Sequence, residues 1–242
     1  MTDRIQAEIA HWKQLAGQAE RVWGWEGAVG RRRALRRAGL LVEAARLRPG
    51  VRALELGCGT GVFTTLARTS GADITAIDLS RDLLDLARFK SPGATVRFIV
   101  GNIEAMPFRE GVFDAIYGSS VLHHLDVRIA LMEILKVLKP GGRLACVEPN
   151  FLNPHVMLIK KIGALGSRAG ELPHETAFVR WRVAREMERA GFRQVSVRPV
   201  DFLHPATPER WAHLVERVGR VIEDLPVLRE VAGSLLIAGV KA

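Results

Sequence analysis

Three glycines at alternate positions, Gly57, Gly59 and Gly61, are the residues around which binding chemistry can be argued first. An apolar run from Val51 to Leu56 precedes them, and a helix-favouring segment from Val62 to Arg68 follows. The glycines therefore form the predicted turn between a buried strand and a helix N-terminus. Because residues without side chains let backbone N–H groups approach a ligand closely, this turn is predicted to cradle a small molecule.

Asp78 favours a nucleoside as that molecule. It ends a second predicted strand, Asp73 to Ile77, about twenty residues beyond the glycines, where a carboxylate can bind both hydroxyls of a ribose. A dinucleotide fingerprint needs Gly-x-Gly-x-x-Gly, but here the third glycine comes one residue early and Val62 stands in its place. The spacing argues against a nicotinamide-dependent oxidoreductase.

Four further segments follow these two features in a fixed order. They are Gly101 to Phe108 (GNIEAMPF), Phe113 to Tyr117 (FDAIY), Val121 to Leu125 (VLHHL) and Leu138 to Leu144 (LKPGGRL). Over residues 50–150 the set resembles the motifs of class I S-adenosylmethionine (SAM)-dependent methyltransferases, in the style of the ubiquinone and menaquinone biosynthesis enzymes and of other small-molecule methyltransferases. The resemblance implies SAM as the cofactor and S-adenosyl-L-homocysteine as the product.

The same resemblance assigns a set of cofactor-binding residues. They are Glu55, Gly57, Cys58, Gly59, Gly61, Asp78, Leu79, Asn102, Ile103 and Ser119. Asp78 is expected at the ribose, Asn102 and Ile103 at the adenine, and Ser119 at the methionine amino group, with Glu55 orienting the loop or reaching that amino group through water. Related sequences often carry Asp in place of Asn102, and a simple turn residue is the alternative interpretation there.

His123, His124 and Glu148 are the candidate catalytic residues. A hydroxyl nucleophile loses its proton as it attacks, and imidazole is a suitable base near neutral pH. Glu148 ends the neighbouring strand, where it could orient a histidine or bind the substrate. The alternative is that one histidine only caps the next helix or packs beneath the site. No metal site is predicted, because His123, His124 and Asp126 are too close in sequence to converge easily on one ion.

The alternation of strands and helices predicts an α/β fold with a doubly wound, Rossmann-like, mostly parallel sheet. By resemblance the sheet has seven strands and an antiparallel hairpin at one edge. We expect a single domain over residues 1–242. Its parts are an N-terminal helical cap (1–50), the SAM-binding core (51–150), a substrate-lid insertion (151–175), and C-terminal helices and edge strands (176–242).

The regions on either side of the core are expected to build the substrate cavity. Cap helices are expected at 3–22 and 31–46, and one arginine of Arg31 to Arg33 could meet the methionine carboxylate. The apolar segment Val156 to Ile162 suits an aliphatic or aromatic substrate or transient membrane contact, with packing against the sheet as the alternative. Candidate substrate-facing polar residues are His155, His174, Asp201 and His204.

Charge and hydrophobicity indicate which kinds of binding partner the chain favours. The 242-residue chain is 48% hydrophobic and carries a net charge of +9, divided as +5 over residues 1–50, 0 over 51–150 and +4 over 151–242. A basic surround could favour an anionic substrate, an acidic membrane surface or RNA, whereas the excess of 28 Arg over 7 Lys equally fits a compositional bias. The absence of an eighteen-residue apolar run, the charged N-terminus and the two isolated cysteines predict a cytoplasmic protein.

We therefore expect a SAM-dependent methyltransferase that acts on a small molecule, at a hydroxyl of a sugar, polyketide, quinone or lipid precursor. An RNA methyltransferase is the first alternative, but Tyr117-Gly118-Ser119-Ser120 stands where amino-group RNA enzymes carry Asn/Asp-Pro-Pro-aromatic, which disfavours nucleic acid. A SAM-binding regulatory protein without turnover is the alternative from another class. The sequence leaves the acceptor and the oligomeric state open.

Overall fold

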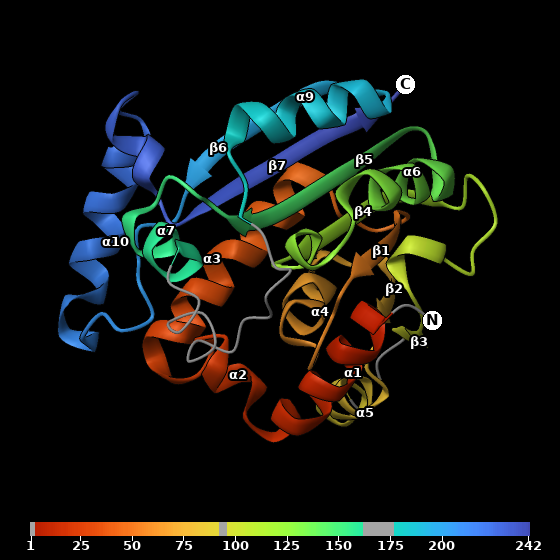
Figure 1. Ribbon diagram of the computed structural model, residues 1–242, viewed down its shortest axis with the longest axis horizontal. Coiled ribbons are helices and arrows are strands. Elements are labelled where there is room, and N and C mark those ends of the chain that lie inside the picture. Colours follow the sequence, from red (N-terminus) through yellow and green to blue (C-terminus); the bar gives the residue numbers. More distant parts are fainter. Residues whose placement is uncertain (1–2, 92–95, 162–176) are drawn as a thin grey trace.

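The computed structural model describes residues 3–91, 96–161 and 177–242 (Figure 1). The predicted lid therefore falls in part outside the described residues, and so does His174. At its centre is one seven-stranded sheet with the strand order β3-β2-β1-β4-β5-β7-β6. The strands are β1 (Arg52–Leu56), β2 (Asp73–Asp78), β3 (Arg97–Val100), β4 (Phe113–Ser119), β5 (Leu138–Pro149), β6 (Phe192–Val200) and β7 (Ser234–Lys241).

The first five strands pair in parallel, and β7 pairs antiparallel with both β5 and β6. This confirms the predicted Rossmann-like, mostly parallel sheet with an antiparallel edge pair. The strand order reverses at β1, which lies between β2 and β4. In open α/β sheets a ligand crevice forms outside the carboxyl ends of the strands at such a reversal, so the topology places a site beyond β1 and β4.

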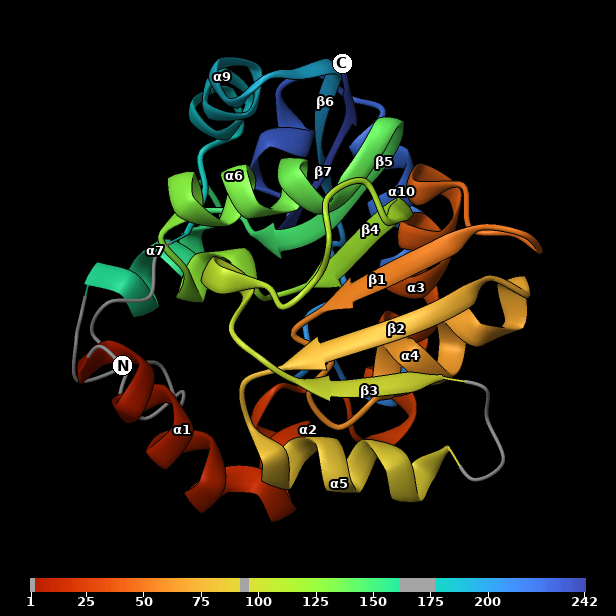
Figure 2. The ribbon, with the colours of Figure 1, turned by 90° about the vertical axis from the view of Figure 1, so that its right-hand side faces the viewer.

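Helices cover both faces of the sheet (Figure 2). The helices are α1 (Asp3–Leu15), α2 (Ala19–Val22), α3 (Gly27–Ala45), α4 (Val62–Ala67), α5 (Arg81–Lys90), α6 (Val127–Val137), α7 (Pro154–Lys161), α9 (Arg180–Ala190) and α10 (Glu209–Glu223). Along β1 the side chains alternate: Ala53 packs with α3 and α4, whereas Leu54 and Leu56 pack with α6 and α9. Strands buried on both faces explain the continuous apolar runs in the sequence.

Helix α1 lies apart from both helical layers, beyond the arrowheads of β1 and β2 in Figure 2. It belongs to the predicted segment 3–22, which is interrupted: α1 ends at Leu15, a 3-10 turn follows over Ala16–Gln18, and α2 is a single turn. The segment thus folds across the carboxyl edge of the sheet, where the topology places the site.

Two predicted helix starts are wrong. Helix α3 begins at Gly27 and not at Arg31, because Gly30 lets the backbone of Trp25 pack against its first turn; a Cβ there would lie 2.4 Å from the Trp25 carbonyl carbon. The sequence also predicts a helix over residues 176–190; Thr176 lies outside the described residues, and helix α9 begins at Arg180, because Phe178 forms a parallel bridge with Asn150. The contact between Gly30 and Trp25 is local, whereas the bridge between Phe178 and Asn150 is a tertiary contact that overrides local helix propensity.

Candidate active site

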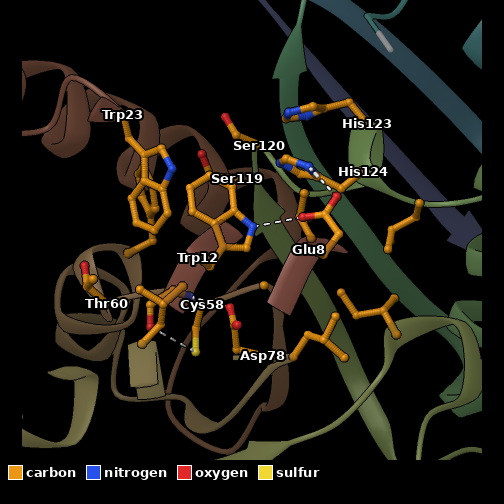
Figure 3. A pocket seen from close by; sticks show the side chains of 18 of the residues that line it. Glu8, Trp12, Trp23, Cys58, Thr60, Asp78, Ser119, Ser120, His123 and His124 are labelled. Atoms are coloured by element: carbon orange, nitrogen blue, oxygen red, sulfur yellow. Dashed lines mark hydrogen bonds and ion pairs between the residues drawn. The ribbon is translucent and has the colours of Figure 1, made fainter. Parts of the chain in front are cut away.

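A pocket of about 290 Å³ opens beyond the carboxyl ends of β1, β2 and β4, under α1 (Figure 3). From the sheet side its wall includes Gly57, Cys58, Gly59, Asp78, Leu79, Asn102, Ile103, Ser119, Ser120, His123 and His124. From the N-terminal helices it includes Ile5, Glu8, Trp12, Val22, Trp23 and Trp25. One wall is thus polar and glycine-rich, and the other is apolar and aromatic.

The glycine loop shapes the pocket floor as expected for a cradle. Gly57 and Gly59 have φ angles of 59° and 51°, a left-handed backbone that side chains disfavour. A Cβ on Gly57 would lie 2.5 Å from a Val121 methyl carbon, and one on Gly59 would lie 2.9 Å from the Trp23 ring. Gly61 does not line the pocket; its missing side chain lets the start of α4 pack against Ala87 of α5.

Asp78 stands at the end of β2 and is tied to the glycine loop. Its Oδ2 accepts a hydrogen bond of 2.7 Å from the Gly59 N–H, and its Oδ1 accepts one of 2.9 Å from the Ser80 N–H. Burial raises the pKa of this carboxyl group, and the backbone hydrogen bonds oppose the shift. The side chain borders the pocket, so its remaining acceptor positions are placed to receive hydroxyl donors from a ligand.

Two histidines form the pocket wall beyond β4. They belong to the 3-10 turn Leu122–His124, and their rings lie 4.1 Å apart. His123 Nδ1 lies 2.8 Å from Glu148 Oε2, and His124 Nδ1 lies 3.3 Å from Glu8 Oε1. A carboxylate partner at Nδ1 favours the tautomer in which Nε2 is the basic nitrogen. The His123 ring is therefore arranged to take up a proton at Nε2, whereas the 3.3 Å ion-pair distance between His124 and Glu8 does not fix the tautomer of His124.

Glu148 is fully buried at the end of β5 and does not line the pocket. Its Oε1 accepts hydrogen bonds from the N–H groups of Val121 and Leu122, at 3.0 and 2.9 Å. Burial alone would raise the pKa of this carboxyl group, but the hydrogen bond and charge of His123 and these backbone donors lower it overall. Glu148 therefore positions His123 and its turn; direct substrate binding, the other sequence interpretation, has no support in this geometry.

Comparisons with known proteins find methyltransferases similar to the central part of the chain. Residues 54–146 match the methyltransferase domain model Methyltransf_11. The chain is 36% identical over 110 residues to a demethylmenaquinone methyltransferase from Renibacterium salmoninarum, and 37% identical over 95 residues to a malonyl-[acyl-carrier protein] O-methyltransferase from Serratia marcescens. Over the part of the chain that they cover, these matches support a class I SAM-dependent methyltransferase. This confirms the family predicted from the motifs.

The extent of these matches is limited. The first alignment covers 45% of this chain and 46% of its relative, and the second covers 39% and 36%. The chain thus spans about half the length, or less, of the curated relatives it matches. A crystal structure from Thermotoga maritima, described as a SAM-dependent methyltransferase and possible histamine N-methyltransferase, has a TM-score of 0.69 at 19% identity and covers 97% of this chain and 99% of its own. At that identity the likeness shows the fold alone.

The remaining predicted cofactor residues differ in whether they line the pocket. Cys58, Leu79, Asn102, Ile103 and Ser119 line the pocket. Asn102 Oδ1 already accepts a 2.9 Å hydrogen bond from the Glu104 N–H, so its side chain serves the turn as well as the pocket wall.

Glu55 does not line the pocket. It is buried on the face of the sheet that α3 and α4 cover, where the Tyr117 hydroxyl donates a 2.9 Å hydrogen bond to its Oε2. Its contacts fit the predicted role in orienting the loop rather than contact with a ligand.

Three functional candidates escaped the sequence analysis: Glu8, Trp12 and Arg37. Glu8 and Trp12 are four residues apart on one face of α1, and the Trp12 indole N–H donates a 2.9 Å hydrogen bond to Glu8 Oε2. That spacing was the available signal, but nothing in it predicts a histidine partner.

Arg37, and not Arg31 to Arg33, is the arginine beside the β4 end of the pocket. Its Nη1 donates to Ser119 Oγ and Ser120 Oγ at 3.3 and 3.1 Å. Arg33 instead donates a 3.0 Å hydrogen bond to the Gly24 carbonyl and stacks 4.8 Å from the Trp25 ring centroid. Arg37 thus belongs to the same arginine-rich helix as Arg31 to Arg33, and contact of an arginine with the methionine carboxylate stays a prediction.

The other polar candidates do not line the pocket. His155 and His204 contact each other, with ring centroids 4.6 Å apart, and Asp201 bonds Arg37. Asp126 caps α6 by accepting from the Arg128 and Ile129 N–H groups. Within the described residues, no group of three His, Cys, Asp or Glu side chains could hold a metal ion, and no helix is long and apolar enough to cross a membrane.

Proposed function

We propose that this chain binds SAM in the pocket under α1 and catalyses methyl transfer to a hydroxyl group of a small, largely apolar molecule. The sulfonium cofactor supplies an electrophilic methyl group, so the protein has mainly to align the acceptor and remove its proton. The observation that carries the proposal is the pair of histidines on the pocket wall: His123 is hydrogen-bonded to Glu148 at Nδ1, and His124 Nδ1 lies 3.3 Å from a Glu8 carboxylate oxygen.

The residues of the floor fit the cofactor. Glycines without side chains border it, Asp78 stands where a ribose can donate to a carboxylate, and Leu79 and Ile103 offer apolar surface of the kind that an adenine ring requires. Ser119 and Arg37 add hydrogen-bonding groups at the end of β4. These assignments rest on pocket placement together with the family match.

The opposite wall supports an apolar or aromatic acceptor. Ile5, Trp12, Trp23 and Trp25 border the pocket there. A wall with few hydrogen-bonding groups suits rings and hydrocarbon, whereas many hydroxyls of a free sugar would be left without partners. A quinone, polyketide or lipid precursor is therefore favoured over a free sugar, in line with a demethylmenaquinone methyltransferase among the relatives.

The test separates cofactor binding from proton removal. His123→Ala and His124→Ala should keep the affinity for S-adenosylhomocysteine within about twofold, measured by calorimetry, while at least one loses ~10²- to 10⁴-fold in turnover with phenolic or other hydroxylated acceptors. Asp78→Asn should instead weaken S-adenosylhomocysteine binding by about tenfold or more, because a charged acceptor at the ribose is lost.

The outcomes are distinguishable. Two fully active histidine variants would remove the base from the proposal and leave the methyltransferase reaction standing. Binding of S-adenosylhomocysteine with no product release from any hydroxylated acceptor or cell extract would favour the non-catalytic SAM-binding alternative. Unchanged binding in Asp78→Asn would contradict the placement of the cofactor.

A further inference from the structure

Helix α10 presents an apolar face to solvent. The helix packs on the protein through Ala212, Val215 and Gly219, and a Cβ on Gly219 would lie 2.9 Å from Phe202. On its outer side Trp211, Leu214, Val218 and Val221 are 50%, 50%, 48% and 63% exposed. The helical spacing of Trp211, Leu214, Val215, Val218 and Ile222 in the sequence predicts one apolar stripe, but Trp211, Leu214 and Val218 of this stripe are exposed.

The exposed surface continues past the end of the helix. Leu225, Val227, Leu228 and Val231 follow in the connection that includes the 3-10 turn Leu228–Val231, and all four are exposed. We call these four residues and the four of the helix the α10 patch. Single exposed apolar residues are ordinary on protein surfaces, but eight in one short segment indicate a binding surface.

The charges around the α10 patch are segregated. Both acidic residues within the helix body pair with arginines: Glu216 lies 2.6 Å from Arg220 and 3.5 Å from Arg32, and Glu223 forms hydrogen bonds of 2.7 and 2.6 Å with Arg36 of α3. Arg210 and Arg217 are exposed beside the apolar side chains. Glu209 and Asp224, at the two ends of the helix, are exposed acids. The rim of the helix body is therefore basic.

We propose that the α10 patch docks this protein on the surface of an anionic lipid bilayer. An amphipathic helix with a tryptophan and aliphatic residues beside arginines can lie in the plane of the interface, with its apolar face among the acyl chains and its cations at anionic headgroups. The net charge of +9 acts in the same direction. Self-association through the same patch would bring two arginine rims together, so the charge pattern favours lipid over a second copy.

The patch lies on the same edge of the sheet as the pocket. Strand β6 runs in the direction of β5, because both are antiparallel to β7. Its last residue, Val200, is in register through Ser234 with Pro149, which lines the pocket. Two strand spacings, ~10 Å, thus separate the strand that leads into α10 from the pocket wall. Docking there suits an apolar acceptor, and this step rests on the proposed function.

The proposed membrane contact is thus at the α10 patch and not at Val156 to Ile162, the segment for which the sequence predicted it. In the described part of Val156 to Ile162, Leu158 is exposed, whereas Val156, Met157 and Ile159 are partly buried. Figure 1 shows α7 and α10 on the same side of the molecule, at its left.

The experiment is vesicle flotation of the full chain. Wild-type protein should bind vesicles of phosphatidylcholine with phosphatidylglycerol and lose binding as salt is raised, while pure phosphatidylcholine vesicles bind at least about tenfold less. Leu214→Glu with Val218→Glu, and separately Arg210→Glu with Arg217→Glu, should each reduce partition at least about tenfold. Phe89→Glu and Met132→Glu, at exposed apolar residues on α5 and α6, are the matched controls and should bind as wild type does.

Folding of each variant is checked by circular dichroism and by S-adenosylhomocysteine affinity, which α10 substitutions should leave unchanged. No binding of wild type to anionic vesicles would overturn the proposal, as would full binding by the Leu214 and Val218 double variant. A dimer in light scattering that this variant dissociates would assign the patch to a second copy instead. None of these results depends on turnover, so the membrane proposal and the proposed function can fail separately.

Discussion

Glu55 is buried beneath the glycine loop without lining the pocket, and its ionisation is unfavourable there. Removal from water raises its pKa from 4.5 to about 7, and the hydrogen bond from Tyr117 only partly opposes this shift. Between these two values the folded protein holds a proton that the unfolded chain has released. The free energy of unfolding therefore falls as pH rises through this interval, and levels off above the higher value.

Glu55→Gln should remove this pH dependence. A shift from 4.5 to about 7 corresponds to about 3 kcal/mol of stability lost between pH 4.5 and pH 7.5 in the wild type. Glutamine keeps an acceptor for the Tyr117 hydroxyl and cannot ionise. Urea unfolding at a series of pH values measures the slope, with the exposed Glu110→Gln as the control. Equal slopes in the wild type and in Glu55→Gln would show that Glu55 ionises freely in the fold.

The site residues that the sequence could predict are those carried by local motifs. Gly57, Gly59 and Asp78 lie at strand ends, and a parallel sheet brings such ends to one edge regardless of the details of packing. Glu8 and Arg37 could not be predicted, because their partners, His124 and Ser119, are far away in sequence. Their roles depend on how the N-terminal helices lie across the sheet, which periodicity does not specify.

At the scale of elements, α1 contributes a wall of the site and a carboxylate. Trp12 packs edge to face against both Trp23 and His124, with ring centroids 5.2 and 6.0 Å apart. Glu8, one turn earlier, contacts the His124 ring nitrogen. The helix thus places a charged partner on one of the two candidate bases, and Glu8 is a positioning residue for His124.

Glu8→Gln should change the pH profile of turnover as well as its size. Loss of the nearby negative charge makes the imidazolium less stable, so the acidic limb of the profile should move to lower pH while the maximal rate falls at least about tenfold. Glutamine can still accept the Trp12 hydrogen bond, which limits structural damage. The exposed Glu26→Gln at the start of α3 is the control. A lower rate with an unmoved profile would assign Glu8 a purely structural role.

The sequence predicted the elements of the central sheet better than the ends and exposure of several helices. Continuous apolar runs located central strands such as β1 and β4, because burial on both faces leaves a strong pattern, whereas β6 is largely exposed and has no such run. Amphipathicity on α10 was detected correctly, but a helical stripe has the same period whether it packs on a core or faces a partner. Which side of an amphipathic helix is covered is decided only by tertiary contacts.

Across the whole molecule, a buried charge network ties the N-terminal cap to the C-terminal strands. Arg37 of α3 donates to Asp201 at 3.4 Å and to Ser234 of β7 at 2.8 Å, and Arg36 pairs with Glu223 of α10. Burial lowers the pKa of Arg37, and the attraction of Asp201 opposes that shift. The same guanidinium group reaches Ser119 and Ser120 at the pocket, so one side chain links the cap, the site and the sheet edge.

Removing one partner of this network should lower the free energy of unfolding far more than breaking an ion pair on the surface. Asp201 has a φ of 71°, so Asn, which also tolerates the left-handed region, isolates the loss of charge from backbone strain. Asp201→Asn should lower the free energy of unfolding by about 3 kcal/mol, because it leaves the buried Arg37 cation without its carboxylate. Asp73→Asn, which breaks the exposed pair with Arg97, should cost about 0–1 kcal/mol.

A double-mutant cycle with Arg37→Met decides whether the pair acts as a unit. With the cation gone, the additional loss from Asp201→Asn should shrink to about 1 kcal/mol or less, since no buried charge is left uncompensated. Urea unfolding gives the four free energies, and melting temperatures should follow in the same order. If the two losses simply add, Arg37 and Asp201 stabilise the fold independently, and the cap and the C-terminal strands are not coupled through this contact.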